Sequence, residues 1–171
     1  FQIPFLFESH AEIDFVLTQM DIFFRQGFDQ NNYILLGWSE AGFVRLMSTK
    51  PVATIADLRK VKVWTWEDAP MTRMIFEEAR VSAIPLSVPD VLVGLQTGLV
   101  DVVYAPLSGA ISLQWFTKTR YITDVKLIYL IGGVVIKKKV FNKIAPAHQK
   151  IVTDVWQRQM NRLKQTIRKE N

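Results

Sequence analysis

Large aromatic and acidic side chains follow two short apolar segments of the chain, residues 61–63 and 100–103. The side chains concerned are Trp64, Trp66, Glu67, Asp68 and Tyr104. In an α/β sheet, the ends of the strands are where small ligands bind. An indole or a phenol offers such a ligand an apolar face and one polar group. Each aromatic by itself could equally be part of the core, but as a set they favour contact with a ligand.

Two classes of ligand would suit these residues. Trp64 and Trp66 are two residues apart, so in a strand they project to the same side, and with Tyr104 they could form three walls of an apolar slot. Burial would hold a bulky apolar or aromatic molecule there, at about 25 cal/mol per Å². The ring faces would hold a cation, at roughly 0.5–2 kcal/mol per ring, with Glu67 or Asp68 as counter-charge. Asp68 is also the expected N-cap of the next helix, a structural role that competes with binding.

Motifs of catalysis and cofactor binding do not occur in the sequence. His10 and His148 are its two histidines, both expected near the start of a helix and without a nucleophile nearby. The absence of cysteine excludes disulfides and thiolate metal ligands. No nucleophile elbow, phosphate-binding loop or metal-ligand spacing is found. We therefore predict a protein that is not an enzyme and has no catalytic residue, metal or cofactor.

The net charge of +5 is unevenly distributed along the chain. Ten Lys/Arg and two Asp/Glu lie from Lys137 onward, whereas eleven and fourteen precede it. A basic C-terminal helix could bind nucleic acid or an acidic membrane. The positive residues alternate with Gln, Asn and apolar positions, without an aromatic-interleaved basic patch. A solvated face that pairs with acidic groups is therefore favoured, and no nucleic acid partner is expected.

Hydrophobic periodicity predicts helices that alternate with short strands. Ser9 and Glu12 have the spacing of a capping box and begin a helix that we expect to end at Gly27 and residues 31–32. A long helix is expected from Pro146. The strands are expected at residues 33–38, 42–48, 61–66, 82–86, 100–104, 121–123 and 126–136. This alternation predicts βαβ units and a largely parallel sheet.

Several phrases occur in an order that is typical of one family. They are PFLF at residues 4–7, IADLRKVKV at 55–63, GLQTGLVD at 94–101 and QKIV at 149–152. Over essentially the whole chain, this order resembles the substrate-binding (DctP-type) subunit of TRAP transporters. The phrase at 94–101 and the strand before Trp64 are the most specific parts of the resemblance.

The resemblance implies an α/β, two-lobed periplasmic-binding-protein-like fold of the class II type, with a ligand cleft between the lobes. It also implies a periplasmic location and delivery of a small organic ligand to the TRAP membrane permease subunits. Family chains extend well upstream of Phe1, so the resemblance implies a C-terminal fragment with one lobe incomplete. Residues 1–41 would be part of lobe I, residues 42–129 lobe II, and residues 130–171 a return to lobe I with a long C-terminal helix.

The departures from the family pattern concern the ligand site. Where the family usually places an arginine that clamps a ligand carboxylate, this chain has Trp64. An indole has one N–H donor and no charge, so a bidentate salt bridge is impossible there. The polar pair that usually follows the next strand reads Tyr104-Ala105. Arg45 lies near another site where the family often has a basic residue, and the sequence is equally consistent with a surface role for it.

The leading hypothesis is a periplasmic solute receptor for an apolar, aromatic or cationic ligand, and not for a simple carboxylate. One alternative is an effector-sensing domain of a transcriptional regulator, because such proteins reuse two-lobed α/β folds. Another is a dicarboxylate receptor that uses a different arginine. An enzyme would need an acid/base pair across the cleft. An exposed sheet edge also predicts a possible homodimer.

Overall fold

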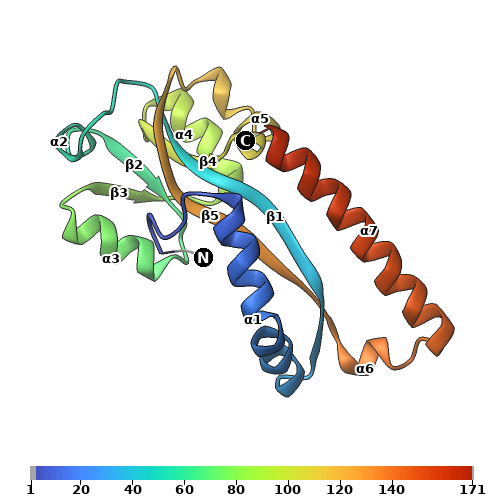
Figure 1. Cartoon of the computed structure of the whole chain (residues 1–171). Coiled ribbons are helices and arrows are strands. Elements are labelled where there is room, and N and C mark those ends of the chain that lie inside the picture. Colours follow the sequence, from blue (N-terminus) through green and yellow to red (C-terminus); the bar gives the residue numbers. More distant parts are fainter. Residues whose placement is uncertain (1–2, 171) are drawn as a thin grey trace. The chain divides into compact units, whose positions relative to one another are not determined.

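The chain divides into two units (Figure 1), seen in a computed structural model that describes residues 3–170. Unit 1 comprises Phe1–Gly42 and Ile128–Asn171, and unit 2 comprises Phe43–Leu127. The boundaries fall within two long strands, β1 (Tyr33–Ser48) and β5 (Tyr121–Lys137). The sequence predicted lobe boundaries at 41/42 and 129/130, and the assignment of the two units to lobes of a complete receptor stays a prediction.

Unit 1 is built from two long helices and parts of the two long strands. Its elements are α1 (His10–Gln30), the first part of β1, the last part of β5, α6 (Lys138–Phe141) and α7 (Pro146–Glu170). The ring of Phe24 in α1 contacts Trp38 of β1 at a centroid distance of 5.1 Å. Trp156 of α7 lies so close to Gly37 that a Cβ at that position would be 2.9 Å from the indole nitrogen. Both helices therefore pack directly on β1.

Both ends of α1 agree with the sequence prediction, except that Gly27 does not interrupt the helix. Ser9 accepts from the Glu12 N–H while the Glu12 carboxylate accepts from the Ser9 N–H, which is the expected capping box. The helix then continues through Gly27 to the cap residue Asn31, and Asn32 has a positive φ of 63°. A single glycine lowers helix stability by only about 1 kcal/mol, which the packing of the helix on β1 overrides.

Unit 2 contains the five-stranded part of the sheet. Its own strands are β2 (Lys62–Thr65), β3 (Ser82–Pro85) and β4 (Val102–Pro106), and the order is β3-β2-β4-β1-β5. Strand β2 is parallel to both β3 and β4, whereas β1 is antiparallel to β4. The sheet is therefore mixed, and the prediction of a largely parallel sheet was correct only for β2, β3 and β4.

Short helices connect the strands of unit 2. They are α2 (Ile55–Leu58), α3 (Pro70–Glu78), α4 (Val91–Thr97), α5 (Leu107–Ser112) and the 3₁₀ turns η1 (Val88–Asp90) and η2 (Trp115–Thr117). Pro70 occupies the first turn of α3, where its missing N–H costs nothing. Gly98 ends α4 with a φ of 71°, as a C-terminal glycine should.

The buried apolar side chains are concentrated in unit 2. Of the 23 buried hydrophobic residues in the described part of the chain, 18 belong to unit 2 and five to unit 1.

Among the described residues, no helix has the length and apolarity needed to cross a membrane.

Candidate ligand-binding site

The aromatic residues predicted to bind ligand form one cluster in unit 2. The centroid of the Trp64 ring, at the end of β2, lies 5.8 Å from that of Trp66 and 5.1 Å from that of Tyr104. Trp115 of η2 completes the cluster, edge-on to Trp64 at 5.2 Å. The sequence therefore identified a true neighbourhood, because neighbouring parallel strands end at the same edge of the sheet.

The cluster is packed, and it does not form the open three-walled slot that the alternation of side chains suggested. The side chain of Trp64 is 1% exposed, and its indole N–H donates to the Leu86 carbonyl at 3.0 Å. Trp115, 1% exposed, packs beside it. Trp66, 49% exposed, is the aromatic of the cluster that offers a face to a ligand.

Two buried hydroxyl groups lie beside the cluster. Neither the Tyr104 hydroxyl nor the Thr65 hydroxyl makes a hydrogen bond to the residues that the structure describes. Burial raises the pKa of Tyr104, and the polar groups of Thr65, Thr72 and the Trp66 backbone, which are near its hydroxyl but outside hydrogen-bond geometry, lower it by less. A buried hydroxyl without a partner costs roughly 1–3 kcal/mol, so a polar group supplied by a ligand or water would be stabilising here.

The two acidic candidates lie at the surface after β2. Glu67 and Asp68 are exposed, and the Glu67 carbonyl accepts a hydrogen bond from Arg73 at 3.1 Å. Asp68 is not the N-cap of α3, because the helix begins at Pro70 and the cap position falls on Ala69, without a side-chain cap bond. Both residues are therefore exposed and directly follow Trp66 in the sequence.

Arg45 is held away from the cluster. In the antiparallel register of β1 and β4, Arg45 lies opposite Ala105, and Leu46 opposite Tyr104. Directly opposite residues share a face and neighbours alternate, so Arg45 and Tyr104 project from opposite faces. The Arg45 guanidinium forms an ion pair with Asp124 of β5.

Asp101 positions the two strands that carry the cluster. Its carboxylate accepts from the Lys62 N–H at 3.1 Å and forms an ion pair with Lys50 at 3.0 Å. Burial opposes ionisation, but the contacts with Lys62 and Lys50 prevail and the pKa of Asp101 is lowered. The aspartate of the GLQTGLVD phrase therefore ties β4 to the start of β2.

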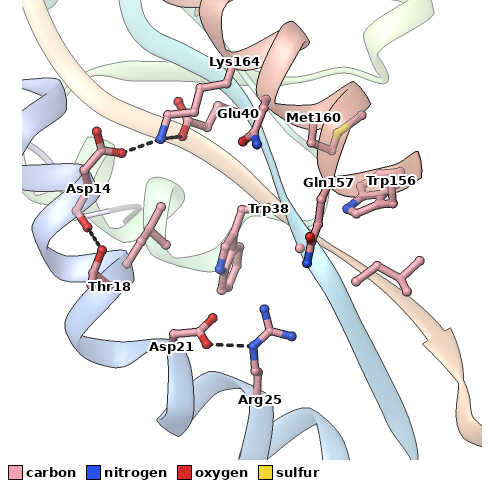
Figure 2. A pocket seen from close by; sticks show the side chains of 14 residues that line it. Asp14, Thr18, Asp21, Arg25, Trp38, Glu40, Trp156, Gln157, Met160 and Lys164 are labelled. Atoms are coloured by element: carbon pink, nitrogen blue, oxygen red, sulfur yellow. Dashed lines mark hydrogen bonds and ion pairs between the residues drawn. The ribbon is translucent and has the colours of Figure 1, made fainter. Parts of the chain in front are cut away.

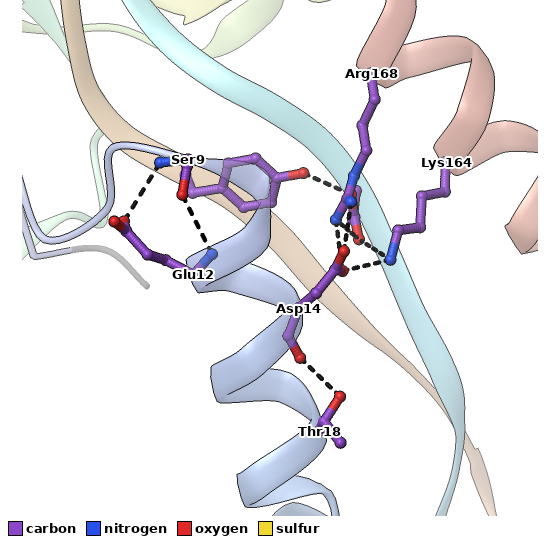
Figure 3. Close-up of polar contacts among 8 residues, drawn as sticks. Ser9, Glu12, Asp14, Thr18, Lys164 and Arg168 are labelled. Atoms are coloured by element: carbon purple, nitrogen blue, oxygen red, sulfur yellow. Dashed lines mark hydrogen bonds and ion pairs between the residues drawn. The ribbon is translucent and has the colours of Figure 1, made fainter.

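Unit 1 contains a partly buried ionic cluster that the sequence did not reveal (Figure 3). Arg168 of α7 donates to Asp14 of α1 at 2.8 Å and to Glu40 of β1 at 2.7 Å, while Lys164 contacts both carboxylates. The Tyr129 hydroxyl donates to Glu40, whose side chain is 3% exposed. The hydrogen bond from Arg168 lowers the pKa of Asp14 to about 2, against the opposing effect of burial. Part of the C-terminal positive charge is thus neutralised inside the unit.

No group of three or more metal-ligating side chains occurs among the described residues. The aromatic cluster of unit 2 leaves one of its rings, that of Trp66, exposed. The ionic cluster of unit 1 is internally paired and has a structural role in joining α1, β1 and α7.

A comparison with models of known families finds a match over the whole chain. The model of the bacterial extracellular solute-binding proteins, family 7 (DctP), matches residues 1–171. Among curated proteins, the 2,3-diketo-L-gulonate-binding periplasmic protein YiaO of Escherichia coli is 26% identical over 149 residues. That alignment covers 86% of this chain and 45% of the relative.

Solved structures share the fold. DctP7, an extracytoplasmic solute receptor of Bordetella pertussis that binds pyroglutamic acid, superposes with a TM-score of 0.87 at 20% identity. A TRAP periplasmic solute-binding protein of Xanthobacter autotrophicus with bound β-D-galacturonate gives 0.85 at 18% identity. The matches cover 98% and 96% of this chain, but 55% of each solved chain. The chain thus spans about half the length of the relatives that it matches.

Proposed function

Because this chain belongs to the bacterial extracellular solute-binding proteins of family 7, we propose that it acts as the solute receptor of a TRAP transporter and delivers a small organic ligand to the membrane permease. The observation that supports this proposal is the match of the family model to all 171 residues. The family is one of binding proteins and not of enzymes.

The family membership and the fold expected from the resemblance are confirmed. The expected periplasmic location is confirmed as that of the family, whose members are extracellular solute-binding proteins. A receptor also agrees better with this family than an effector-sensing domain of a transcriptional regulator or an enzyme does.

We propose further that the ligand contacts the exposed face of Trp66, beside Tyr104 and Trp64, and is aromatic, apolar or cationic. Trp64 replaces the arginine expected from the family pattern, and Arg45 is paired with Asp124 on the other face of the sheet from Tyr104. Glu67 and Asp68 supply the negative charge that a cationic ligand would require. The buried Tyr104 and Thr65 hydroxyls offer hydrogen bonds to a polar substituent.

The relatives favour a second candidate, a carboxylate ligand. The proteins named above are described as binding 2,3-diketo-L-gulonate, pyroglutamic acid and β-D-galacturonate, which are all organic acids. In this chain, such an acid would need a cation other than residue 64, for example Arg45 after release from Asp124, or a residue outside residues 1–171.

Native mass spectrometry of the intact protein, purified from its host without organic extraction, tests both candidates. An aromatic, apolar or cationic molecule that co-purifies, and whose affinity falls about tenfold in Trp66→Ala, is the expected result. Phe116→Ala is the matched control, since Phe116 is also an exposed aromatic of unit 2 but lies outside the cluster. A bound carboxylate whose affinity is unchanged in Trp66→Ala would establish the second candidate.

A further inference from the structure

Most of the basic residues near the end of the chain have no acidic partner among the residues that the structure describes. Of the ten Lys and Arg from Lys137 onward, the four that form ion pairs are Lys138, Lys150, Lys164 and Arg168. The other six are exposed and form no ion pair within that part of the chain: Lys137, Lys139, Lys143, Arg158, Arg162 and Lys169. Between Lys137 and Lys169 the sequence has a single acidic residue, Asp154, which already pairs with Lys150. Pairing with acidic groups, which the sequence favoured, therefore explains fewer than half of these charges.

One side of α7 packs against the rest of unit 1, and the unpaired charges of this helix lie on the other side. Trp156, Met160 and Lys164 line a pocket that residues of α1 and β1 complete (Figure 2). Successive residues of a helix are rotated by about 100° around its axis, so a second set of residues falls within an arc of about 60° on the opposite side. This outer face of α7 consists of five exposed residues: Ile151, Val155, Arg158, Arg162 and Lys169.

The outer face of α7 combines long cationic side chains with exposed aliphatic ones. Ile151 is 56% exposed and Val155 is 40% exposed. None of the five residues is aromatic. The remaining unpaired cations, in or beside α6, are Lys137, Lys139 and Lys143. The start of α7 is joined to α6 and its following turn, because the Gln149 amide donates to the Phe141 and Ile144 carbonyls at 3.1 and 2.8 Å.

These side chains suit a phospholipid surface better than a protein surface. The centre of a protein interface is enriched in aromatic residues and depleted of Lys, which is the reverse of the outer face. Anionic head groups attract each nearby Lys or Arg strongly enough to raise affinity about fivefold. Exposed aliphatic side chains of a basic helix insert at the boundary between head groups and acyl chains. The chain before Lys137 has a net negative charge, so an anionic surface would attract α6 and α7 in preference to it.

We propose that the outer face of α7, together with the lysines in and beside α6, docks this protein on an anionic phospholipid surface. The proposal concerns unit 1 alone and does not depend on the ligand or on Trp66 in unit 2. For a receptor that delivers its ligand to a membrane permease, docking on the surrounding lipid would raise the effective concentration of receptor at the permease.

Co-sedimentation of the intact protein with lipid vesicles tests the proposal. Vesicles of phosphatidylcholine with about 30% phosphatidylglycerol provide the anionic surface, in about 0.1 M salt. The double variant Arg158→Gln/Arg162→Gln should bind these vesicles about 25-fold more weakly, since each charge contributes about fivefold. The matched control is Arg80→Gln/Arg120→Gln, which removes two exposed arginines of unit 2 that form no ion pair with the described residues. The control should retain the affinity of the unmodified protein.

Three results would overturn the proposal. They are equal binding to vesicles of phosphatidylcholine alone, an equal loss of affinity in the two double variants, and binding that persists in about 1 M salt, where charges are screened within about 3 Å. The permease embedded in phosphatidylcholine alone tests the alternative partner, an acidic protein surface. If Arg158→Gln/Arg162→Gln weakens binding to that permease but not to the anionic vesicles, the outer face is a protein interface. None of these results would alter ligand binding, which native mass spectrometry measures separately.

Discussion

The two units of this chain are stabilised by different kinds of interaction. Unit 2 buries a large set of apolar side chains around β2 and β4, with Trp64 and Trp115 at one end. Unit 1, of nearly equal length, has few buried apolar residues and instead joins α1, β1 and α7 through Asp14, Glu40 and Arg168. Apolar burial is stabilising by itself, whereas a buried ion pair is stabilising only while every partner is present. The difference indicates that unit 2 is the more robust of the two.

Truncation of Trp64 should produce the largest effect. Trp64→Ala removes a fully buried indole and should lower the free energy of unfolding by about 3–5 kcal/mol, measured by urea denaturation of the intact protein. Trp66→Ala, at the exposed neighbour, should cost less than about 1 kcal/mol. Equal losses for the two variants would show that the packed cluster is not the centre of unit 2.

Removal of Glu40 should be the most damaging polar change in unit 1. Glu40→Ala leaves the half-buried Arg168 and the Tyr129 hydroxyl with fewer partners, and should cost about 2–4 kcal/mol. Asp21→Ala breaks an exposed pair with Arg25 and should cost less than about 1 kcal/mol. A loss for Glu40→Ala as small as that for Asp21→Ala would show that the ionic cluster does not stabilise unit 1.

Acid should weaken unit 1 through Asp14. The pKa of Asp14 is lowered from 3.8 to about 2, chiefly by Arg168, so its stabilising contribution is complete above pH 4 and disappears as the pH falls to about 2. Because this side chain is partly exposed, solvent screening reduces the contribution to about 1 kcal/mol. Urea midpoints at pH 5 and pH 2.5 should differ less in Asp14→Asn than in the unmodified protein. An equal difference in both would assign the acid sensitivity to other carboxylates.

Substitutions at the helix starts should give the smallest difference in stability between the two units. Ser9→Ala removes the side-chain half of the capping box of α1, the hydroxyl that accepts from the Glu12 N–H, and should cost about 1 kcal/mol. Ser87→Ala, in unit 2, should cost only a few tenths of a kcal/mol, because Ser87 bonds to the Asp90 carboxylate and caps no backbone N–H. Thermal unfolding of both variants measures the difference, and a larger loss for Ser87→Ala would contradict it.

Local chemistry allowed much of the fold to be predicted. The capping box at Ser9, the proline that begins α3 and the left-handed Gly98 depend on residues within four positions of one another. Such features are fixed by short-range sterics and hydrogen bonds, which a sequence displays directly. The resemblance predicted the fold, and the positions of Trp64 and Tyr104 after two apolar segments predicted that the two rings lie close together.

Contacts between distant residues decided the rest. The sequence predicted a break at residues 39–42, because serine, glutamate and glycine there favour a turn, yet β1 runs unbroken from Tyr33 to Ser48. Glu40 can be buried within a strand because Arg168, 128 positions later, donates to its carboxylate. Similarly, Trp64 can be buried because the Leu86 carbonyl accepts a hydrogen bond from its indole N–H and the ring of Trp115 packs against its own. The sequence by itself thus determined the family and most of the helices and short strands. The continuity of β1 and the exposure and pairing of each side chain depended on partners that only the tertiary structure brings within reach.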